Sequence, residues 1–294
     1  MINTKVEVAR IRLERLRLIG GILARSCLYS ADVVRLRVVD EDGRTEHERA
    51  EALHVARNST RARQKLDAVC ELLAEVHRGL EAQLEIHGRA KLCGALAAVL
   101  DRAYALLDIY LYELVHQAGV FPSCGPRCAA CCTDVPPVLP VEALRMKQAL
   151  LRLDDGRIRL QRAVEQARQF QKLLLERLPP SPRVDTSDPA YRRTQLAWRS
   201  LGYPCPVLGD DGNCVAYAAR PLACRIHIHV EDPAHCEPRS PRFLKAERPP
   251  LWGHPREARV ELALAGISSL LGLEGVPNLQ WGLARTPVDD ADEL

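Results

Sequence analysis

Residues 124–132 read Cys-Gly-Pro-Arg-Cys-Ala-Ala-Cys-Cys, so four thiols fall within nine residues. A hydrophobic core cannot absorb them all, because the segment is short and its Gly-Pro step is typical of a surface turn. The two-residue gap between Cys128 and Cys131 lets a tight turn direct both sulfurs at one metal ion. The adjacent side chains of Cys131 and Cys132 diverge. They would serve two metals, different edges of one multinuclear cluster, or a metal and a redox role.

A second group of four cysteines follows at wider, irregular spacings: Cys205, Cys214, Cys224 and Cys236. The surrounding sequence is rich in Gly, Pro and Asp, which indicates loops. The run Asp211-Gly212-Asn213 is typical of a tight turn, and this turn would bring Cys205 back towards Cys214. Arg220 and Arg225 flank Cys224, where their charge would offset that of a sulfur-ligated site.

The protein has eleven cysteines, and the other three, Cys27, Cys70 and Cys93, are scattered through the helical N-terminal part. There cysteine behaves as a small hydrophobic residue. Residues 1–7 carry charges where a signal peptide needs an apolar core, so we expect a cytoplasmic protein. Clustered cysteines in a reducing compartment are metal ligands or redox groups before they are disulfides. The predicted metal ligands are Cys124, Cys128, Cys131, Cys132, Cys205, Cys214, Cys224 and Cys236.

The two cysteine groups together resemble the YkgJ-type cysteine-cluster family, whose members are described as zinc- or iron-chelating. The family joins a compact CxxCxxCC-like group to C-P-x-L, Gly-x-Cys-x-x-Tyr and Arg-Pro-x-x-Cys-Arg patterns. The matching segments are residues 124–132, 205–208, 212–217 and 220–225, followed by Cys236. The chain departs from the pattern by having three residues, not two, between its first two cysteines. Residues 1–117 resemble no family that we recognise.

The resemblance implies a metal or iron–sulfur centre but no particular reaction. The irregular spacings favour an iron–sulfur cluster, of the 4Fe–4S type, over zinc, although four thiolates would satisfy either. Tyr217, Arg220 and Arg225 are expected to contact this cofactor through packing and charge balance. Glu142 is a further candidate ligand or base, although its place in the first turn of a helix already accounts for it.

Three hypotheses for the function remain open, and the sequence does not decide whether the protein is an enzyme. The first is a metal-binding protein that holds an iron–sulfur cluster or zinc. The second is an S-adenosylmethionine-dependent protein lysine N-methylase, because the flagellin lysine N-methylase is a relative with the same cysteine pattern. The third is a zinc-stabilised interaction module whose N-terminal helices bind a protein partner.

Outside the cysteine groups the sequence predicts helices. Apolar residues recur at three- and four-residue steps over 61–87 and 91–116, and Ser59 or Thr60 would cap the first helix. Gly88 separates the two, which predicts an antiparallel pair. Further helices are expected over 8–27, from Pro140 to about 155, over 158–178, from Asp188 to Trp198 and over 255–273, with a short strand over 33–39.

We therefore expect a mainly α fold in three parts. A helical N-terminal region spans 1–117, a loop-rich cysteine-cluster metal-binding domain spans 118–245, and a C-terminal helix with an acidic tail spans 246–294. The net charge of +3, from 41 basic and 38 acidic residues, is too balanced for a nucleic-acid partner. The longest weakly polar stretch, residues 262–273, is too short to span a membrane.

Overall fold

The computed structural model describes residues 46–87, 89–120, 122, 124, 127–178, 184–228, 236, 251–273 and 275–286. The chain divides into two compact units, Met1–Arg37 and Val38–Leu294, and every described residue belongs to the second unit. Cys27, the predicted helix over 8–27, the predicted strand over 33–39 and the acidic tail lie outside the described residues.

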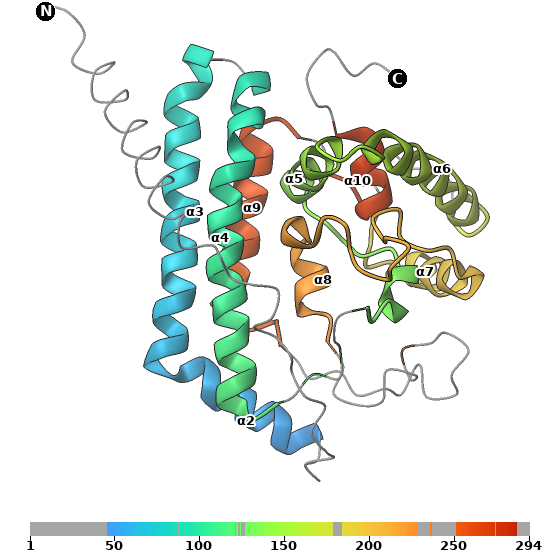
Figure 1. The fold of residues 1–294 in the computed structure, drawn as a ribbon. Coiled ribbons are helices and arrows are strands. Elements are labelled where there is room, and N and C mark those ends of the chain that lie inside the picture. The colour runs from blue at the N-terminus through green and yellow to red at the C-terminus, as the bar shows by residue number, and fades with distance from the viewer. Residues whose placement is uncertain are drawn as a thin grey trace, which may run out of the picture. The chain divides into compact units, whose positions relative to one another are not determined.

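The described part of the chain is mainly α-helical and contains no strand, which confirms the predicted fold class. All six helices that the sequence predicts within the described residues are present, with ends shifted by a few residues. The α-helices in Figure 1 are α2 (Glu46–Asn58), α3 (Thr60–His87), α4 (Arg89–Ala118), α5 (Pro140–Leu151), α6 (Gly156–Leu175), α7 (Pro189–Leu201), α8 (Leu222–Ile226), α9 (Ala258–Leu270) and α10 (Leu279–Arg285). The 3-10 helices are η1 (Ala130–Thr133) and η2 (Tyr217–Ala219).

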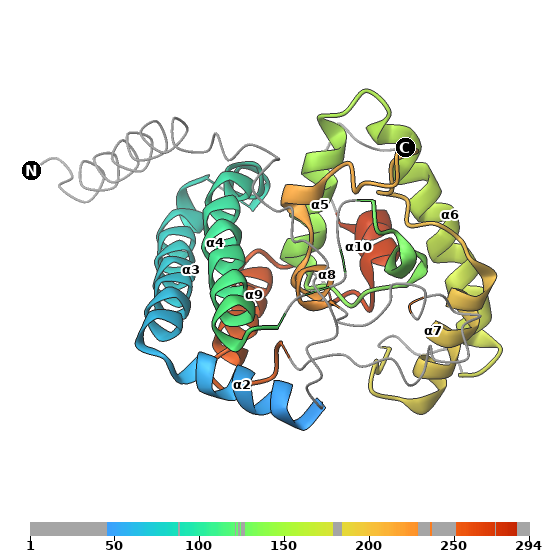
Figure 2. The same ribbon diagram turned by 60° about the horizontal axis from the view of Figure 1, so that its bottom comes forward.

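Helices α3 and α4 form the predicted pair and lie side by side along their length (Figure 1). Ser59 caps α3, because its Oγ accepts a hydrogen bond from the backbone N of Ala62 at 3.2 Å. The apolar face of α3, which includes Leu66 and Leu73, is buried. Helix α9 packs against this pair in both views (Figures 1 and 2). The predicted C-terminal helix therefore completes the core of α3 and α4.

A second packed group consists of α5, α6 and α10 (Figure 2). Gly156 allows the close turn between α5 and α6, because a Cβ there would lie 1.9 Å from the carbonyl O of Leu150. Helix α10, which the sequence did not predict, is anchored by Trp281, whose Nε1 donates to the carbonyl O of Ala167 at 3.1 Å. Seven residues are too few to show a helical period in the sequence.

Helix α2, also not predicted, is held by a buried carboxylate from a distant part of the chain. Glu257 is fully buried, and its Oε1 accepts from Arg57 Nε at 2.9 Å and from the hydroxyl of Tyr110 at 2.6 Å. These bonds tie α2 and α4 to the turn before α9. None of the described helices combines the length and the apolar character that crossing a bilayer requires.

Candidate metal centre

All eight predicted ligands lie within the described residues, on short or irregular segments. Cys124 and Cys128 precede η1, which itself contains Cys131 and Cys132. The second group is distributed as Cys205 after α7, Cys214 at an isolated bridge, Cys224 within α8, and Cys236 beyond α8. Cys236 is buried, and the other seven are half-buried. Around Cys205 and Cys214 the described residues form turns and bends, as the Gly, Pro and Asp content of this segment predicts, whereas α5, α6 and α7 lie between the two cysteine groups.

The predicted turn folds the chain back between Cys205 and Cys214. Leu208 and Cys214 form an antiparallel bridge, and the backbone N of Gly209 donates to the carbonyl O of Asn213 at 2.7 Å. Gly212 occupies the tip of this hairpin with φ of 80°. Its left-handed conformation suits glycine, because an L side chain is strained there.

Replacing Gly212 by alanine should therefore lower the free energy of unfolding by about 1 kcal/mol, through backbone strain alone. A Cβ at Gly212 meets nothing closer than 3.5 Å, so no clash adds to this cost. Gly202→Ala is the matched control, since Gly202 has φ of 72°, no atom within 4 Å of an added Cβ, and a place at the end of α7 outside the hairpin. Urea titration should show similar stability losses for both variants, and only Gly212→Ala should weaken metal retention. Equal metal retention would contradict a link between the hairpin and the centre.

A backbone hydrogen bond joins the two cysteine groups directly. The N of Cys205 donates to the carbonyl O of Cys132 at 2.5 Å. A second link runs from the hairpin tip, where Asn213 Oδ1 accepts from the backbone N of Arg127 at 3.1 Å. Segments about 75 residues apart in sequence therefore lie against one another, as chelation by both groups requires.

Two buried arginines, which the sequence analysis missed, fix the loops that carry cysteines. Arg159 of α6 donates Nη1 to the carbonyl oxygens of Pro206 at 3.2 Å and Leu208 at 2.8 Å, next to Cys205. Its charge is balanced by Asp155 Oδ2 at 2.7 Å. Each carbonyl contact removes freedom from the loop beside a thiol.

Arg199 of α7 holds the last cysteine in the same way. It donates Nη2 to the carbonyl O of Cys236 at 2.9 Å and Nη1 to Asp134 Oδ2 at 3.2 Å. Asp134 follows η1 directly, so Arg199 draws Cys236 towards the compact cysteine group. The pKa of Cys131 is lowered first by its hydrogen bond with Cys132, and the charge of Arg199 lowers it further. Burial raises the pKa of Cys236, and the charge of Arg199 reduces this rise.

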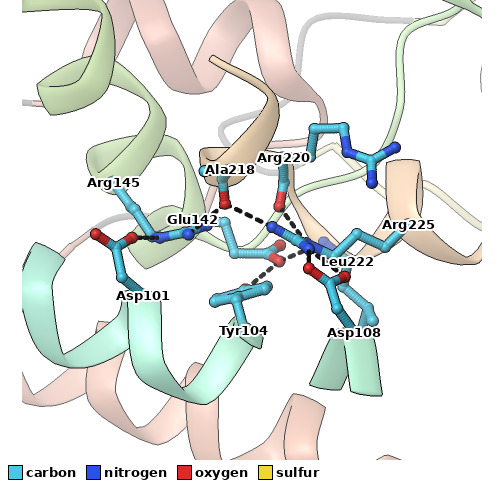
Figure 3. Close-up of polar contacts among 9 residues, drawn as sticks. All are labelled: Asp101, Tyr104, Asp108, Glu142, Arg145, Ala218, Arg220, Leu222 and Arg225. Atoms are coloured by element: carbon cyan, nitrogen blue, oxygen red, sulfur yellow. Dashed lines mark hydrogen bonds and ion pairs between the residues drawn. The ribbon is translucent and has the colours of Figure 1, made fainter. Parts of the chain in front are cut away.

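Glu142, considered as a ligand from the sequence, instead accepts hydrogen bonds from the protein (Figure 3). Its Oε1 accepts from the hydroxyl of Tyr104 and from the backbone N of Leu222 at 2.7 Å. Its Oε2 accepts from the backbone N of Leu139 at 2.9 Å. Burial raises the pKa of this carboxyl, although the hydrogen bonds oppose that effect. Glu142 thus ties α4 and α5 to the first residue of α8, two residues before Cys224.

The guanidinium of Arg225 lies among Asp108, Ala218 and Arg220 and bonds to all three (Figure 3). Its guanidinium pairs with Asp108 of α4, and donates to the carbonyl oxygens of Ala218 at 2.6 Å and Arg220 at 2.8 Å. Arg225 is 5% exposed. The structure therefore places Arg225 as a support for the segment that leads to Cys224. Burial raises the pKa of Cys214, and the charge of Arg225 reduces this rise.

Arg145 of α5 reinforces the same segment. It pairs with Asp101 Oδ1 at 2.7 Å, and it donates to the carbonyl O of Ala218, which Arg225 also contacts. The guanidinium carbon atoms of Arg145 and Arg225 lie 4.4 and 5.0 Å from the centre of the Tyr104 ring. Two cations are thus held around one buried aromatic ring.

Tyr217 and Arg220 stack on each other at the edge of this network. The guanidinium carbon of Arg220 lies 3.5 Å from the centre of the Tyr217 ring, and Tyr217 is 60% exposed. The charge of Arg220 opposes the rise that burial causes in the pKa of Cys214 and Cys224. This is consistent with the predicted charge-balancing role, while a contact with a cofactor stays a prediction.

The thiols affect one another's protonation. Burial raises the pKa of Cys205 to about 12 and that of Cys236 to about 11. Burial also raises the pKa of Cys224, and the charges of Cys205 and Cys131 add to this rise. The pKa of Cys131 is lowered to about 7, chiefly because the neighbouring thiol of Cys132 hydrogen-bonds to it.

As the side chains stand, the cysteines do not enclose an ion. Within the described residues, no three Cys, His, Asp or Glu side chains form a group that could hold a metal. The donor chemistry nevertheless fits a thiolate-bound metal, because the interacting acids are thiols and the cations around them are arginines. Metal binding would then require the sulfurs to close in from the positions that the loops already fix.

Comparison with protein families supports this assignment of chemistry. Residues 123–241 match the family model CxxCxxCC, which is described as a "putative zinc- or iron-chelating domain". Over these residues the chain is similar to the CxxCxxCC domain. The matched residues include all eight clustered cysteines, η1, η2, the helices α5 to α8 and the four buried arginines, which are Arg145, Arg159, Arg199 and Arg225. No curated protein and no solved structure matches the chain.

Several predictions from the sequence gain no support from the structure or the comparisons. These are binding of S-adenosylmethionine, a protein partner for the N-terminal helices, and the absence of a nucleic-acid partner. They stay predictions.

Proposed function

We propose that residues 123–241 bind metal through their clustered cysteine thiolates, as an iron–sulfur cluster. The observation that carries this proposal is the contact between the two cysteine groups, where the backbone N of Cys205 meets the carbonyl O of Cys132. Because this bond holds the groups together, thiols from both can reach a common region. The proposed ligands are the eight cysteines of the two groups, and the expected setting is the reducing cytoplasm.

The spacing of the cysteines favours iron–sulfur over zinc. The adjacent Cys131 and Cys132 lie within one 3-10 turn, unlike the two-residue spacing of structural zinc sites. The wide, irregular spacings of the second group are also unlike the short spacings of such sites.

The surrounding arginines suit a thiolate centre, because four thiolates on one metal site leave it negatively charged. Arg159, Arg199 and Arg220 each favour the ionised form of at least one thiol. Since these charges are held near the cysteines before any metal binds, they would reduce the cost of deprotonating the ligands. The residues of the chain thus position and charge-balance the centre.

Metal analysis of the anaerobically purified protein tests this proposal. We expect iron and acid-labile sulfide, with broad visible absorption, and Cys128→Ser and Cys224→Ser should each lower the iron content. Cys70→Ser is the matched control, since Cys70 is buried in α3 and burial raises the pKa of its thiol. Its iron content should equal that of the wild type.

Three results would each overturn a part of this account. A colourless protein with stoichiometric zinc and no sulfide would replace the iron–sulfur cluster by zinc while keeping the thiolate site. A protein without metal after anaerobic purification and reconstitution would remove the metal-binding function itself. Equal metal loss from all three variants would show that the division of the cysteines into ligands and core residues is wrong.

A further inference from the structure

We propose that Asn213 is a positioning residue of the metal centre, because its side-chain amide holds Arg127, which precedes Cys128, in a left-handed backbone conformation. This rests on the proposed metal-binding function and adds to it a residue that carries no thiol. Asn213 belongs to the hairpin between Cys205 and Cys214, and it lies 86 residues further along the chain than Arg127.

Arg127 has a backbone conformation that residues with a side chain rarely adopt. Its φ is 66°, and within the part of the chain that the structure describes it is the one residue other than glycine with a positive φ. A left-handed backbone brings Cβ too close to the following carbonyl oxygen, so this conformation costs free energy at an arginine. The side chain of Arg127 is exposed, so its burial does not impose the conformation. A contact made by the backbone therefore holds it.

That contact is the hydrogen bond from the backbone N of Arg127 to Asn213 Oδ1, at 3.1 Å. The tip of the hairpin lies against the same residue, because a Cβ added to Gly212 would be 3.5 Å from both the Cβ and the carbonyl O of Arg127. The net contribution of one hydrogen bond is comparable with the cost of a left-handed conformation at one residue. The bond to Asn213 is therefore large enough to decide the conformation of Arg127.

The amide of Asn213 is itself held in one orientation by Asp211. The carboxylate of Asp211 accepts from Asn213 Nδ2 at 2.7 Å and from the backbone N of Asn213 at 3.0 Å. Since the amide nitrogen is engaged there, Oδ1 is the atom directed at Arg127. Gly209 leaves room for this carboxylate, because a Cβ at Gly209 would lie 2.8 Å from Asp211 Oδ1. The hairpin is thus built around the bond that it makes to Arg127.

The torsion at Arg127 determines how the first two cysteines of the compact group lie relative to one another. Arg127 is directly before Cys128 and three residues after Cys124. Rotation about its φ turns the chain before it relative to the chain after it, so loss of the left-handed conformation would redirect Cys124 relative to Cys128. Fixing this torsion before metal binds reduces the entropy lost on binding. Loss of the Asn213 amide should therefore weaken metal binding more than it weakens the fold, since relief of strain at Arg127 offsets part of the lost bond.

Iron retention after anaerobic reconstitution with ferrous iron and sulfide tests the role of Asn213. Asn213→Ala should release iron to a chelator about tenfold faster than the wild type, an effect of the size of one hydrogen bond. Asn58→Ala is the matched control and should release iron at the wild-type rate, because the Asn58 amide bonds to the carbonyl O of His54 at 3.0 Å within α2. Urea unfolding of the metal-free proteins should give similar midpoints for the two variants. A merely structural role of Asn213 would instead lower its midpoint and leave the release rate of the folded protein unchanged.

Two substitutions at Arg127 test the backbone conformation itself. Arg127→Gly and Arg127→Val remove the same charge, but glycine adopts the left-handed conformation at no steric cost, whereas the β-branched valine is strongly disfavoured there. Arg127→Gly should release iron within about twofold of the wild-type rate, and Arg127→Val at least as fast as Asn213→Ala. The double variant Arg127→Gly/Asn213→Ala should retain iron longer than Asn213→Ala alone, because glycine reaches the required conformation without the bond.

The outcomes separate this inference from the proposed function. A wild type that takes up no iron on reconstitution would overturn the proposed function, and with it this inference. A wild type that holds iron, with equal release from Asn213→Ala and Asn58→Ala, would overturn the inference alone. Equal release from Arg127→Gly and Arg127→Val would show that the left-handed backbone does not position the thiols. Circular dichroism identifies any variant that fails to fold, and the Arg127 pair still decides the question if Asn213→Ala is lost in that way.

Discussion

Glu142→Gln is expected to lower the free energy of unfolding by about 2 to 4 kcal/mol, although the side chain keeps its size. The two oxygens of Glu142 accept from Tyr104, Leu222 and Leu139, so both positions face donors. A glutamine must place its NH₂ group against one of these donors. At least one buried N–H or O–H is then left without an acceptor, and the remaining bonds lose their charge assistance.

Denaturant titration of the metal-free protein measures this effect without contributions from the centre. Glu165→Gln is the matched control, because Glu165 lies on the exposed face of α6, where it accepts from Gln169 Nε2 at 2.9 Å. The control should change stability by less than about 0.5 kcal/mol. Similar stabilities for the two variants would show that the Glu142 network does not hold the structure together. Because Leu222 begins α8, Glu142→Gln should also weaken metal retention at Cys224.

Arg225→Met should lower the free energy of unfolding by about 2 to 4 kcal/mol, because it removes the donor to two carbonyl oxygens and a carboxylate. The neutral side chain keeps most of the packing over Tyr104. The carbonyl of Ala218 retains Arg145 as a donor, whereas the carbonyl of Arg220 loses the bond that Arg225 makes. The effect should therefore fall on the segment between Cys214 and Cys224.

Asp108→Asn provides the comparison for this variant. Asp108 is about half exposed, so water can replace part of the lost ion pair, and Arg225 keeps its two carbonyl acceptors. We expect a smaller loss, of about 1 to 2 kcal/mol. Thermal unfolding of both variants should give the order Arg225→Met, then Asp108→Asn, then wild type, from least to most stable. If Asp108→Asn lost as much stability as Arg225→Met, or more, the contacts of Arg225 with the two carbonyl oxygens would contribute little.

The long helices could be predicted because their apolar residues repeat at helical spacing. This holds for α3, where buried side chains recur at three- and four-residue steps from Ala62 to Leu80, and for α4. The ends of α5 and α6 were less predictable, because they depend on Gly156 and the close approach of Leu150. Helix α10 is too short for its period to be seen, and α2 is held by Glu257, which lies 200 residues away from Arg57.

The candidate site shows the same contrast between local and distant information. Cysteine spacing and the Asp-Gly-Asn turn are local patterns, so the candidate ligands and the hairpin could be predicted. The roles of Arg159, Arg199 and Glu142 could not, because each is defined by partners 37 to 80 residues away. An arginine next to apolar residues on a helix resembles a surface residue until the loop that it contacts is known. Arg225 follows Cys224 directly in the sequence, but its guanidinium contacts two backbone carbonyls and Asp108, which the sequence does not reveal.

The arrangement separates two tasks between two kinds of residue. The proposed donor atoms belong to cysteines on short or irregular segments, and arginines with Glu142 attach those segments to helices that have their own apolar core. Such attachment limits how far each thiol can move before metal binds, which reduces the entropy lost on binding. It also explains why the strongest effects on stability are expected at residues that do not bind metal.

X-ray absorption spectroscopy at the metal edge tests the central claim most directly, since it reports the atoms bound to the metal in the intact protein. The account predicts iron with a first coordination shell made of sulfur alone, and loss of protein sulfur from that shell in the Cys214→Ser variant. A first shell dominated by nitrogen or oxygen would contradict it, because the thiols would then not be the ligands of the bound metal.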